Sequence, residues 1–422
     1  MTSVAMHGGA PAPGAGEVPS RWIDAARWAA IAGACTVMVS PPLANAAIVV
    51  MVACLLASGQ AAARLRQAIR QPLAIGAAIV VVAVALGMLW SDVSWTERLR
   101  AFTAWRRLWL IPLLLALLGP AVWKLRMIAA YVAVCTAAAL ISFGIVAVAG
   151  HLPAELTDPA GTLLRNHSSQ SMAFATAAFL CLWAASRPPL SYAMRWAAFG
   201  AGALLVLNMA FVTPGRSGYL ALAVMLPVFA VANLRGWRSA LLVATLAGLF
   251  ACAMAASPLA RGRIDLALRE WKTVQTAGQP SSMGIRANLY ENTLELIRER
   301  PWFGVGSGGF EKAYTAHVQG KYTDWRVLPS ADPHNQFLFF LAEQGVFGLL
   351  AFLAFIALAL ADRGDGGPAR VIAVGMLLAW CATSMLSSHF QTFAEGYLLA
   401  FFLAAMLARP SPGLDRASTS TA

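Results

Sequence analysis

Long apolar segments recur along almost the whole chain, and short polar stretches separate them. A helix needs about 20 apolar residues to cross a bilayer, and twelve segments reach that length or fall slightly short of it. The pattern therefore predicts an all-α polytopic membrane protein with about 12 transmembrane helices. The segments are residues 22–40, 43–59, 72–90, 109–123, 128–150, 168–186, 196–212, 219–234, 240–257, 337–361, 371–387 and 394–408.

The pattern also divides the chain into five parts. Residues 1–20 are rich in Gly, Pro and Ala and show no apolar periodicity, which predicts a disordered tail. The other parts are transmembrane helices 1–9 in residues 21–257, a large polar loop in residues 258–335, transmembrane helices 10–12 in residues 336–408, and a second tail in residues 409–422.

Two features inside the large loop predict local structure. Residues 286–300 place apolar side chains at helical spacing among glutamates and arginines, and a proline follows, so we expect an amphipathic helix that begins near Arg286. The next segment, residues 301–310, is rich in glycine and predicts a tight turn that exposes its backbone.

Positive charge in the short loops sets the orientation, because cytoplasmic loops carry the excess of Lys and Arg. These residues gather in alternate loops, which places both tails in the cytoplasm and residues 258–335 on the outer face. The clusters are Arg64, Arg66 and Arg70; Lys124 and Arg126; Arg187 and Arg195; Arg235 and Arg238; and Arg363 and Arg370.

One stretch on the outer side, residues 91–108, breaks this charge rule. It carries four arginines, Arg98, Arg100, Arg106 and Arg107, interleaved with Trp95 and Trp105 and followed directly by Trp109. We interpret it as a helix that lies along the outer interface and either binds phosphorylated lipid headgroups or anchors the chain. A miscounted transmembrane helix is the alternative.

Composition agrees with a membrane protein and excludes several chemistries. The chain is 59% hydrophobic and 12% charged, with a mean hydropathy of +0.66. All six cysteines fall in apolar segments, where they are packing residues. The chain has no nucleophile elbow and no Walker loop, and its outer carboxylates are too scattered to hold a divalent cation. We therefore expect no metal, no cofactor and no nucleic-acid partner.

Three polar positions on the predicted outer face suggest chemistry at a bilayer surface. Asp332-Pro333-His334-Asn335 opens directly onto an apolar segment, and His334 is a potential acid/base group there. Arg216, in the tight turn of residues 213–218, and Arg286 can each bind a phosphate through two hydrogen bonds. The alternatives are that Asp332 and His334 only cap and anchor a helix, and that both arginines are ordinary interface residues.

These residues together resemble a known family. Its features here are Gly215-Arg216-Ser217-Gly218, Arg286, residues 300–306 with Phe310, His334-Asn335 and residues 343–348. The combination is similar to the O-antigen ligase and polymerase superfamily, and within it to the WaaL-type O-antigen ligases. Gly215 departs from the serine that the family often has before the arginine.

The resemblance implies an enzyme of the bacterial inner membrane with a periplasmic active site. It would transfer O-antigen polysaccharide from an undecaprenyl-pyrophosphate donor to the lipid A core, in contact with membrane lipids. Arg216 and Arg286 would bind the donor pyrophosphate, and His334 would be the catalytic base. Possible further site residues are His167, Glu395, Asp332 and Asn335.

Other functions remain open at this point. An O-antigen polymerase uses the same donor chemistry with another lipid-linked glycan as acceptor. A ligase that modifies protein is less favoured, because only a short tail follows Arg409. A polysaccharide-lipid transporter or flippase belongs to a different class. Transport predicts ionisable groups near the bilayer midplane and related halves of the chain, whereas the polar residues here crowd one face.

Overall fold

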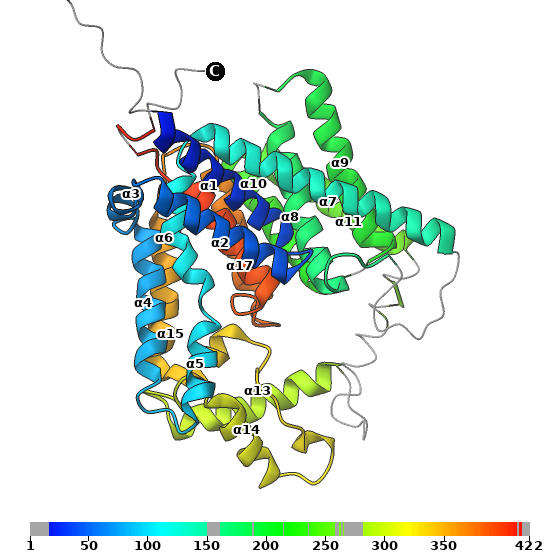
Figure 1. Ribbon diagram of the computed structural model, residues 1–422. Helices are drawn as coiled ribbons and strands as arrows, with labels where there is room; N and C mark the ends of the chain where they lie inside the picture. The colour runs from blue at the N-terminus through cyan, green and yellow to red at the C-terminus, as the bar shows by residue number, and fades with distance from the viewer. Residues whose placement is uncertain are drawn as a thin grey trace, which may run out of the picture.

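The computed structural model describes residues 17–149, 161–187, 190–213, 215–234, 236–257, 261–262, 265, 282–411 and 413–415. These residues form helices joined by turns, with no β-strand in the described ranges. Most of the helices gather into one bundle, and α13 and α14 lie beyond one end of it (Figure 1). The predicted tails fall largely outside the described residues, although the first helix already begins at Glu17.

The helices in chain order are α1 (Glu17–Thr36), α2 (Pro41–Ala57), α3 (Ala61–Ala68), α4 (Pro72–Gly87), α5 (Trp95–Thr103), α6 (Arg107–Leu117), α7 (Ala121–Ala149), α8 (His167–Ala185) and α9 (Tyr192–Phe211). They continue with α10 (Arg216–Asn233), α11 (Trp237–Ala256), α13 (Ser282–Glu299), α14 (Phe310–Gln319), the 3-10 turn η1 (Trp325–Val327), α15 (Gln336–Ala361), α16 (Arg370–Thr383) and α17 (Phe393–Leu407).

Each of the twelve predicted apolar segments coincides with one of these helices. Four of them, α7, α9, α10 and α15, are long and apolar enough to cross a membrane individually. The pair α2 and α3 qualifies only together and is bent by 111°, which would bring the number to five. The all-helical fold is confirmed, and the count of about 12 spans stays a prediction.

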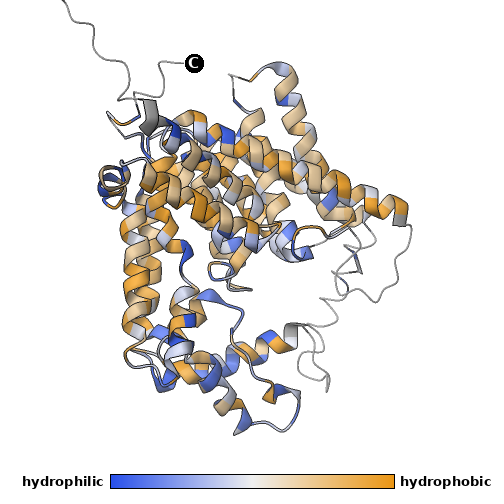
Figure 2. Cartoon of the chain, viewed as in Figure 1, coloured by the Kyte–Doolittle hydropathy of each residue, from blue (hydrophilic) through white to orange (hydrophobic). Residues whose placement is uncertain are grey.

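Two helices, α8 and α17, form the interior of the bundle. Every residue from Ser169 to Cys181 of α8 and from Ala394 to Leu407 of α17 is buried. Burial on every side means that other helices surround both of them. α9 and α10 pack against α8, while α6 and α16 pack against α17, and the bundle is predominantly hydrophobic (Figure 2).

Ion pairs gather at the end of the bundle where α17 finishes, which we call the charged end. Asp415 accepts hydrogen bonds from Arg27 at 2.6 Å and from Arg64 at 3.0 Å, so the start of the last segment is held against α1 and α3. Lys124 binds Asp365 at 2.6 Å. Both cations lie between predicted apolar segments, Arg64 in the short helix α3 and Lys124 in the first turn of α7, and these partners neutralise their charges.

The opposite end, where α8, α10 and α17 begin, carries the short helices α5 and α14 together with α13 and is called the α13 end. α5 is a nine-residue helix with a capping box between Ser94 and Glu97, which agrees with the predicted surface helix in residues 91–108. The predicted amphipathic helix is α13; it begins at Ser282, so Arg286 lies in its second turn. α13 and α14 share a separate apolar cluster with the first turns of α15, formed by Leu289, Leu296, Phe310, Tyr314, Val318, Phe339 and Ala342.

The glycine-rich segment, residues 301–309, packs against a break in α15. Gly345 interrupts this helix with a φ of 65° and a ψ of −163°. The Gly306 N–H donates to the Glu343 carbonyl at 2.8 Å. On either side of this bond, the Val305 N–H donates to the Ala342 carbonyl at 2.9 Å and the Val346 N–H donates to the Pro301 carbonyl at 2.8 Å. The segment thus satisfies backbone groups that the break removes from the helix, and it fixes α13 and α14 relative to α15.

Gly345→Ala should therefore destabilise the protein. The positive φ of residue 345 disfavours any side chain by roughly 1–3 kcal/mol. A Cβ at this position would also collide with the backbone of Trp302. Gly248→Ala in α11 is the matched control, because a Cβ there meets nothing within 4 Å. We expect a lower melting temperature in detergent for Gly345→Ala only; equal melting temperatures for both variants would contradict this account.

Candidate active site at the α13 end of the bundle

His334 lies in the turn that precedes α15, with a φ of 56° that few side chains adopt. Asp332 Oδ1 accepts hydrogen bonds from the His334 backbone N–H at 2.8 Å and from the Ser388 hydroxyl at 2.6 Å. Asp332 therefore holds the backbone of His334 and ties this turn to the one between α16 and α17. The imidazole itself is half-buried.

Capping of α15, the alternative that the sequence left open for Asp332 and His334, is the role of Asn335. It is the N-cap of α15, and its side-chain oxygen accepts from the backbone N–H groups of Phe337 at 3.0 Å and Leu338 at 3.2 Å. Because this oxygen is occupied in capping, Asn335 supports the position of His334.

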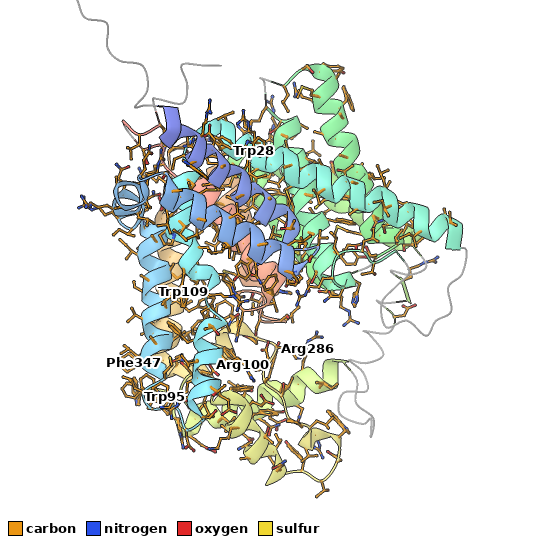
Figure 3. The ribbon with its side chains drawn as sticks, in the orientation of Figure 1. Trp28, Trp95, Arg100, Trp109, Arg286 and Phe347 are labelled. Carbon is orange, nitrogen blue, oxygen red and sulfur yellow. The ribbon has the colours of Figure 1, made fainter. Side chains whose placement is uncertain are left out.

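Tyr290 connects α13 to the His334 turn. Its hydroxyl donates to the Met385 carbonyl at 2.6 Å and lies 3.3 Å from the His334 carbonyl. Burial raises the pKa of this phenol, so it stays protonated. Arg286 lies one helical turn before Tyr290 and shares its face, and its side chain extends from α13 toward the bundle (Figure 3). Arg286 and His334 are thus brought to the same region by one helix and one hydrogen-bonded turn.

Arg216, His167 and Glu395 form a second group where α8, α10 and α17 begin. Ser169 in the first turn of α8 donates to Glu395 Oε1 at 2.6 Å, and the hydroxyls of Ser168 and Ser217 are 3.3 Å apart. His167 and Arg216 are the first residues of α8 and α10. Arg216 is exposed at a helix N-terminus, where the backbone also favours an anion.

The glycines around Arg216 have a steric cause. A Cβ at Gly215 or at Gly218 would collide with Ser171 of α8, and the Ser171 hydroxyl donates to the Gly215 carbonyl at 3.0 Å. α8 and α10 can approach this closely only because both positions lack a side chain. The resembled family often has a serine at position 215, and in this chain the Ser171 hydroxyl lies beside Gly215 instead.

The four arginines of residues 91–108 do not form one binding strip. Arg107 is 4% exposed and donates to the carbonyls of Phe390 at 2.7 Å and Thr392 at 2.6 Å. Arg98 donates to the carbonyls of Val93 and Met88. The prediction that all four could bind headgroups is therefore wrong for Arg107, which is buried; Arg100 and Arg106 remain exposed.

The turn of residues 384–392 joins the first group, Arg286 and His334, to the second group, Arg216, His167 and Glu395. It contacts the His334 turn through Ser388, and it contains His389, whose charge is influenced by both Asp332 and Glu395. Sequence reasoning missed the roles of Tyr290, Ser388 and His389. A tyrosine one turn after Arg286 and a Ser-His pair directly before the last apolar segment were the available signals.

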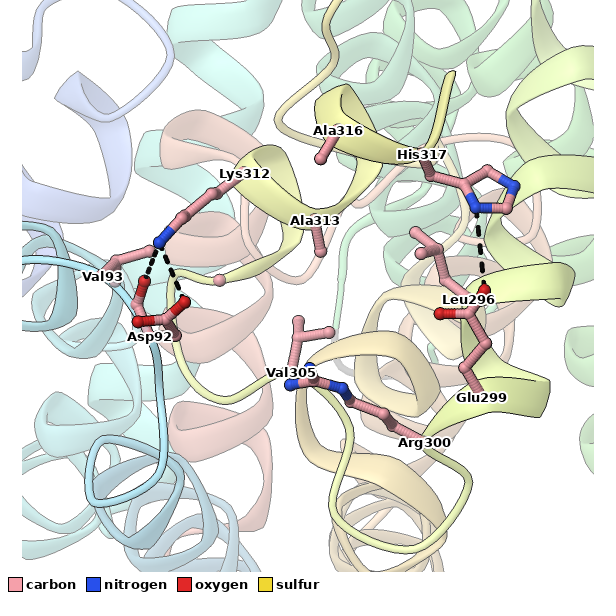
Figure 4. A pocket seen from close by; sticks show the side chains of 11 residues that line it. Asp92, Val93, Leu296, Glu299, Arg300, Val305, Lys312, Ala313, Ala316 and His317 are labelled. Atoms are coloured by element: carbon pink, nitrogen blue, oxygen red, sulfur yellow. Dashed lines mark hydrogen bonds and ion pairs between the residues drawn. The ribbon is translucent and has the colours of Figure 1, made fainter. Parts of the chain in front are cut away.

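Two cavities lie away from these residues. A cavity of about 290 Å³ opens between α13, α14 and the segment before α5, where Lys312 binds Asp92 at 2.9 Å and Arg300 points inward (Figure 4). A second cavity lies at the charged end, lined in part by Arg64 and Arg409. None of the predicted site residues lines either one. Within the described ranges, no cluster of three or more His, Cys, Asp or Glu residues could hold a metal ion.

Comparison with known proteins supports the family resemblance. Residues 201–353 match the family described as O-antigen ligase, and this match spans Arg216, Arg286 and His334 but not His167 or Glu395. A stretch of 76 residues is 33% identical to an uncharacterized protein from Haemophilus influenzae and covers 18% of this chain. The chain spans about a fifth of the length of that curated relative, since the match covers 19% of it.

Proposed function

We propose that this chain, whose residues 201–353 carry the match to the O-antigen ligase family, is an inverting, metal-independent glycosyltransferase of the WaaL type. It transfers O-antigen polysaccharide from undecaprenyl pyrophosphate to the lipid A core oligosaccharide at the periplasmic face of the bacterial inner membrane. The observation that carries the proposal is the linkage of the Arg286–His334 group to the Arg216–Glu395 group through residues 384–392.

The proposed reaction is a single displacement. An acceptor hydroxyl oxygen attacks the anomeric carbon of the donor while the bond from that carbon to the pyrophosphate oxygen breaks. His334 takes the hydroxyl proton, which suits a side chain with an unperturbed pKa of about 6.5. Arg216 and Arg286 neutralise the departing lipid pyrophosphate. One displacement without a covalent enzyme intermediate inverts the anomeric configuration.

Two alternatives have less support. The superfamily that the chain resembles includes polymerases as well as ligases, so a lipid-linked repeat unit as acceptor is the nearest rival. A flippase needs ionisable groups deep in the membrane. Among the described residues, the buried charges that tie helices together lie toward the two ends of the bundle, such as Arg27 and Lys124 at one end and Arg107 and Glu395 at the other.

The decisive experiment combines purified protein, a lipid-pyrophosphate glycan and lipid A core, without ATP and with excess EDTA. We expect a larger lipopolysaccharide to form at an undiminished rate, because two arginines can neutralise the pyrophosphate without a metal. A rate that falls on chelation and returns with Mg²⁺ or Mn²⁺ would contradict metal independence. Product formed only from a second lipid-linked repeat unit would assign the polymerase activity instead.

A further inference from the structure

His389 is a buried imidazole that the proposed reaction does not use. It lies in the turn between α16 and α17 and is 3% exposed. Neither Nδ1 nor Nε2 has a hydrogen-bond partner. A buried polar ring without partners costs free energy, so its presence needs an explanation beyond packing.

The surrounding contacts hold this ring in place. Ser388, directly before it, donates to Asp332, and the Arg107 guanidinium donates to the carbonyls of Phe390 and Thr392 directly after it. With both flanks of the turn fixed, His389 cannot turn outward to solvent without breaking these hydrogen bonds.

The ring lies among groups of both charges from three packed elements. Asp332 in the His334 turn and Glu395 on α17 favour its protonated form, while burial favours its neutral form. Arg107 of α6 faces the same turn, and the Tyr290 hydroxyl of α13 donates to the Met385 carbonyl at its start. Burial is the largest influence, so the pKa of His389 lies below its ordinary value. The ring is therefore neutral at neutral pH although two carboxylates lie near it.

We propose that His389 is a positioning residue that takes up a proton when the anionic pyrophosphate of the donor binds at the α13 end. This inference rests on the proposed function. The proton comes from solvent and forms an N–H bond on the ring. The resulting imidazolium pairs with Asp332 and Glu395 and thereby draws the His334 turn and α17 together around the donor.

The sign of the coupling follows from electrostatics. The negative charge of the donor favours the imidazolium, so donor binding raises the pKa of His389. Between the lower pKa of the free protein and the higher pKa of the complex, binding takes up a proton, and donor affinity falls as pH rises. Below this window the ring is already protonated without donor. Above it the ring is neutral in both states, and the coupling disappears.

Calorimetric titration with farnesyl pyrophosphate tests this coupling. The measurement is made in detergent at about pH 7, in two buffers of different ionisation enthalpy, so that the heats report protons taken up. We expect wild-type protein to take up as much as one proton more per ligand than His389→Gln. His317→Gln is the matched control, because His317 is held by Glu295 at 2.8 Å between α13 and α14. The probe's own ionisation contributes equally to every protein.

The outcomes separate this inference from the proposed function. Binding by wild-type protein without extra proton uptake would overturn the role of His389 and leave the donor site intact. No binding at all would remove the proposed donor site together with the role of His389. Proton uptake that persists in His389→Gln would also overturn the role of His389. Should His389→Gln fail to fold, uptake that survives in each of His7→Gln, His151→Gln, His167→Gln, His317→Gln and His334→Gln would assign the proton to His389, the sixth histidine of the chain, and its loss in any of them would overturn the assignment.

Discussion

His334→Ala and His334→Asn are expected to lower kcat by roughly 10² to 10⁴-fold, the usual contribution of a positioned acid/base group. The hydrogen bonds that place this residue use its backbone, through Asp332 and Tyr290, so both variants should keep the turn. Neither new side chain can accept a proton at neutral pH. Turnover, donor binding and the anomeric configuration of the product would be measured for each variant.

The two variants separate chemistry from backbone strain. Asparagine tolerates the positive φ of 56° at this position, whereas alanine does so at a cost of roughly 1–2 kcal/mol. Loss of turnover in both variants would support the role of a base. Loss in the alanine variant alone would indicate strain in the turn. Near-normal turnover in both, or a retained anomeric configuration, would remove His334 from this role and direct attention to His167 and Glu395.

Arg216→Lys and Arg286→Lys should each lower kcat/KM by roughly 10² to 10³-fold, as expected when a donor to a developing negative charge is lost. Lysine keeps the positive charge but cannot form two parallel hydrogen bonds to a phosphate. Arg216 is exposed, so its replacement should leave the melting temperature unchanged.

Arg298→Lys provides the matched control for both variants. It lies in the last turn of α13, on the same helix as Arg286, and is exposed. Its activity should remain at the wild-type level. Full activity in both Arg216→Lys and Arg286→Lys would mean that charge alone suffices or that the pyrophosphate binds elsewhere, and titration of farnesyl pyrophosphate into each variant would distinguish these cases.

The sequence predicted the helices well because the length and composition of an apolar segment decide locally where a membrane helix forms. It was less accurate at the helix ends. The alternation of positive charge predicts Lys124 in a short loop, whereas in the structure it lies in the first turn of α7, where Asp365 and the Ala408 carbonyl bind its ammonium. Both partners lie more than two hundred residues away in the chain, so the sequence alone gives no sign of them.

In the candidate site, too, neighbouring residues in the sequence identify the reactive groups, but contacts between distant residues decide how those groups are held. His334, Arg216 and Arg286 could be singled out from the sequence, because isolated polar residues beside apolar segments are costly and so indicate function. Their support could not be predicted. Asp332 binds the backbone of His334 rather than its ring, and Tyr290, within the predicted amphipathic helix of residues 286–300, forms the link to the His334 turn.

Neighbouring residues alone are enough to predict that the chain is helical, which segments are apolar and which polar residues are candidates for chemistry. The break of α15 at Gly345, its contact with the glycine-rich segment and the burial of His389 in the turn between α16 and α17 are visible only in the folded molecule. Those arrangements depend on how closely the backbones of two helices approach and on the charges that one helix places beside another. The helices concerned are distant in the chain. They arise only when the packed bundle brings the helices together and excludes water from between them.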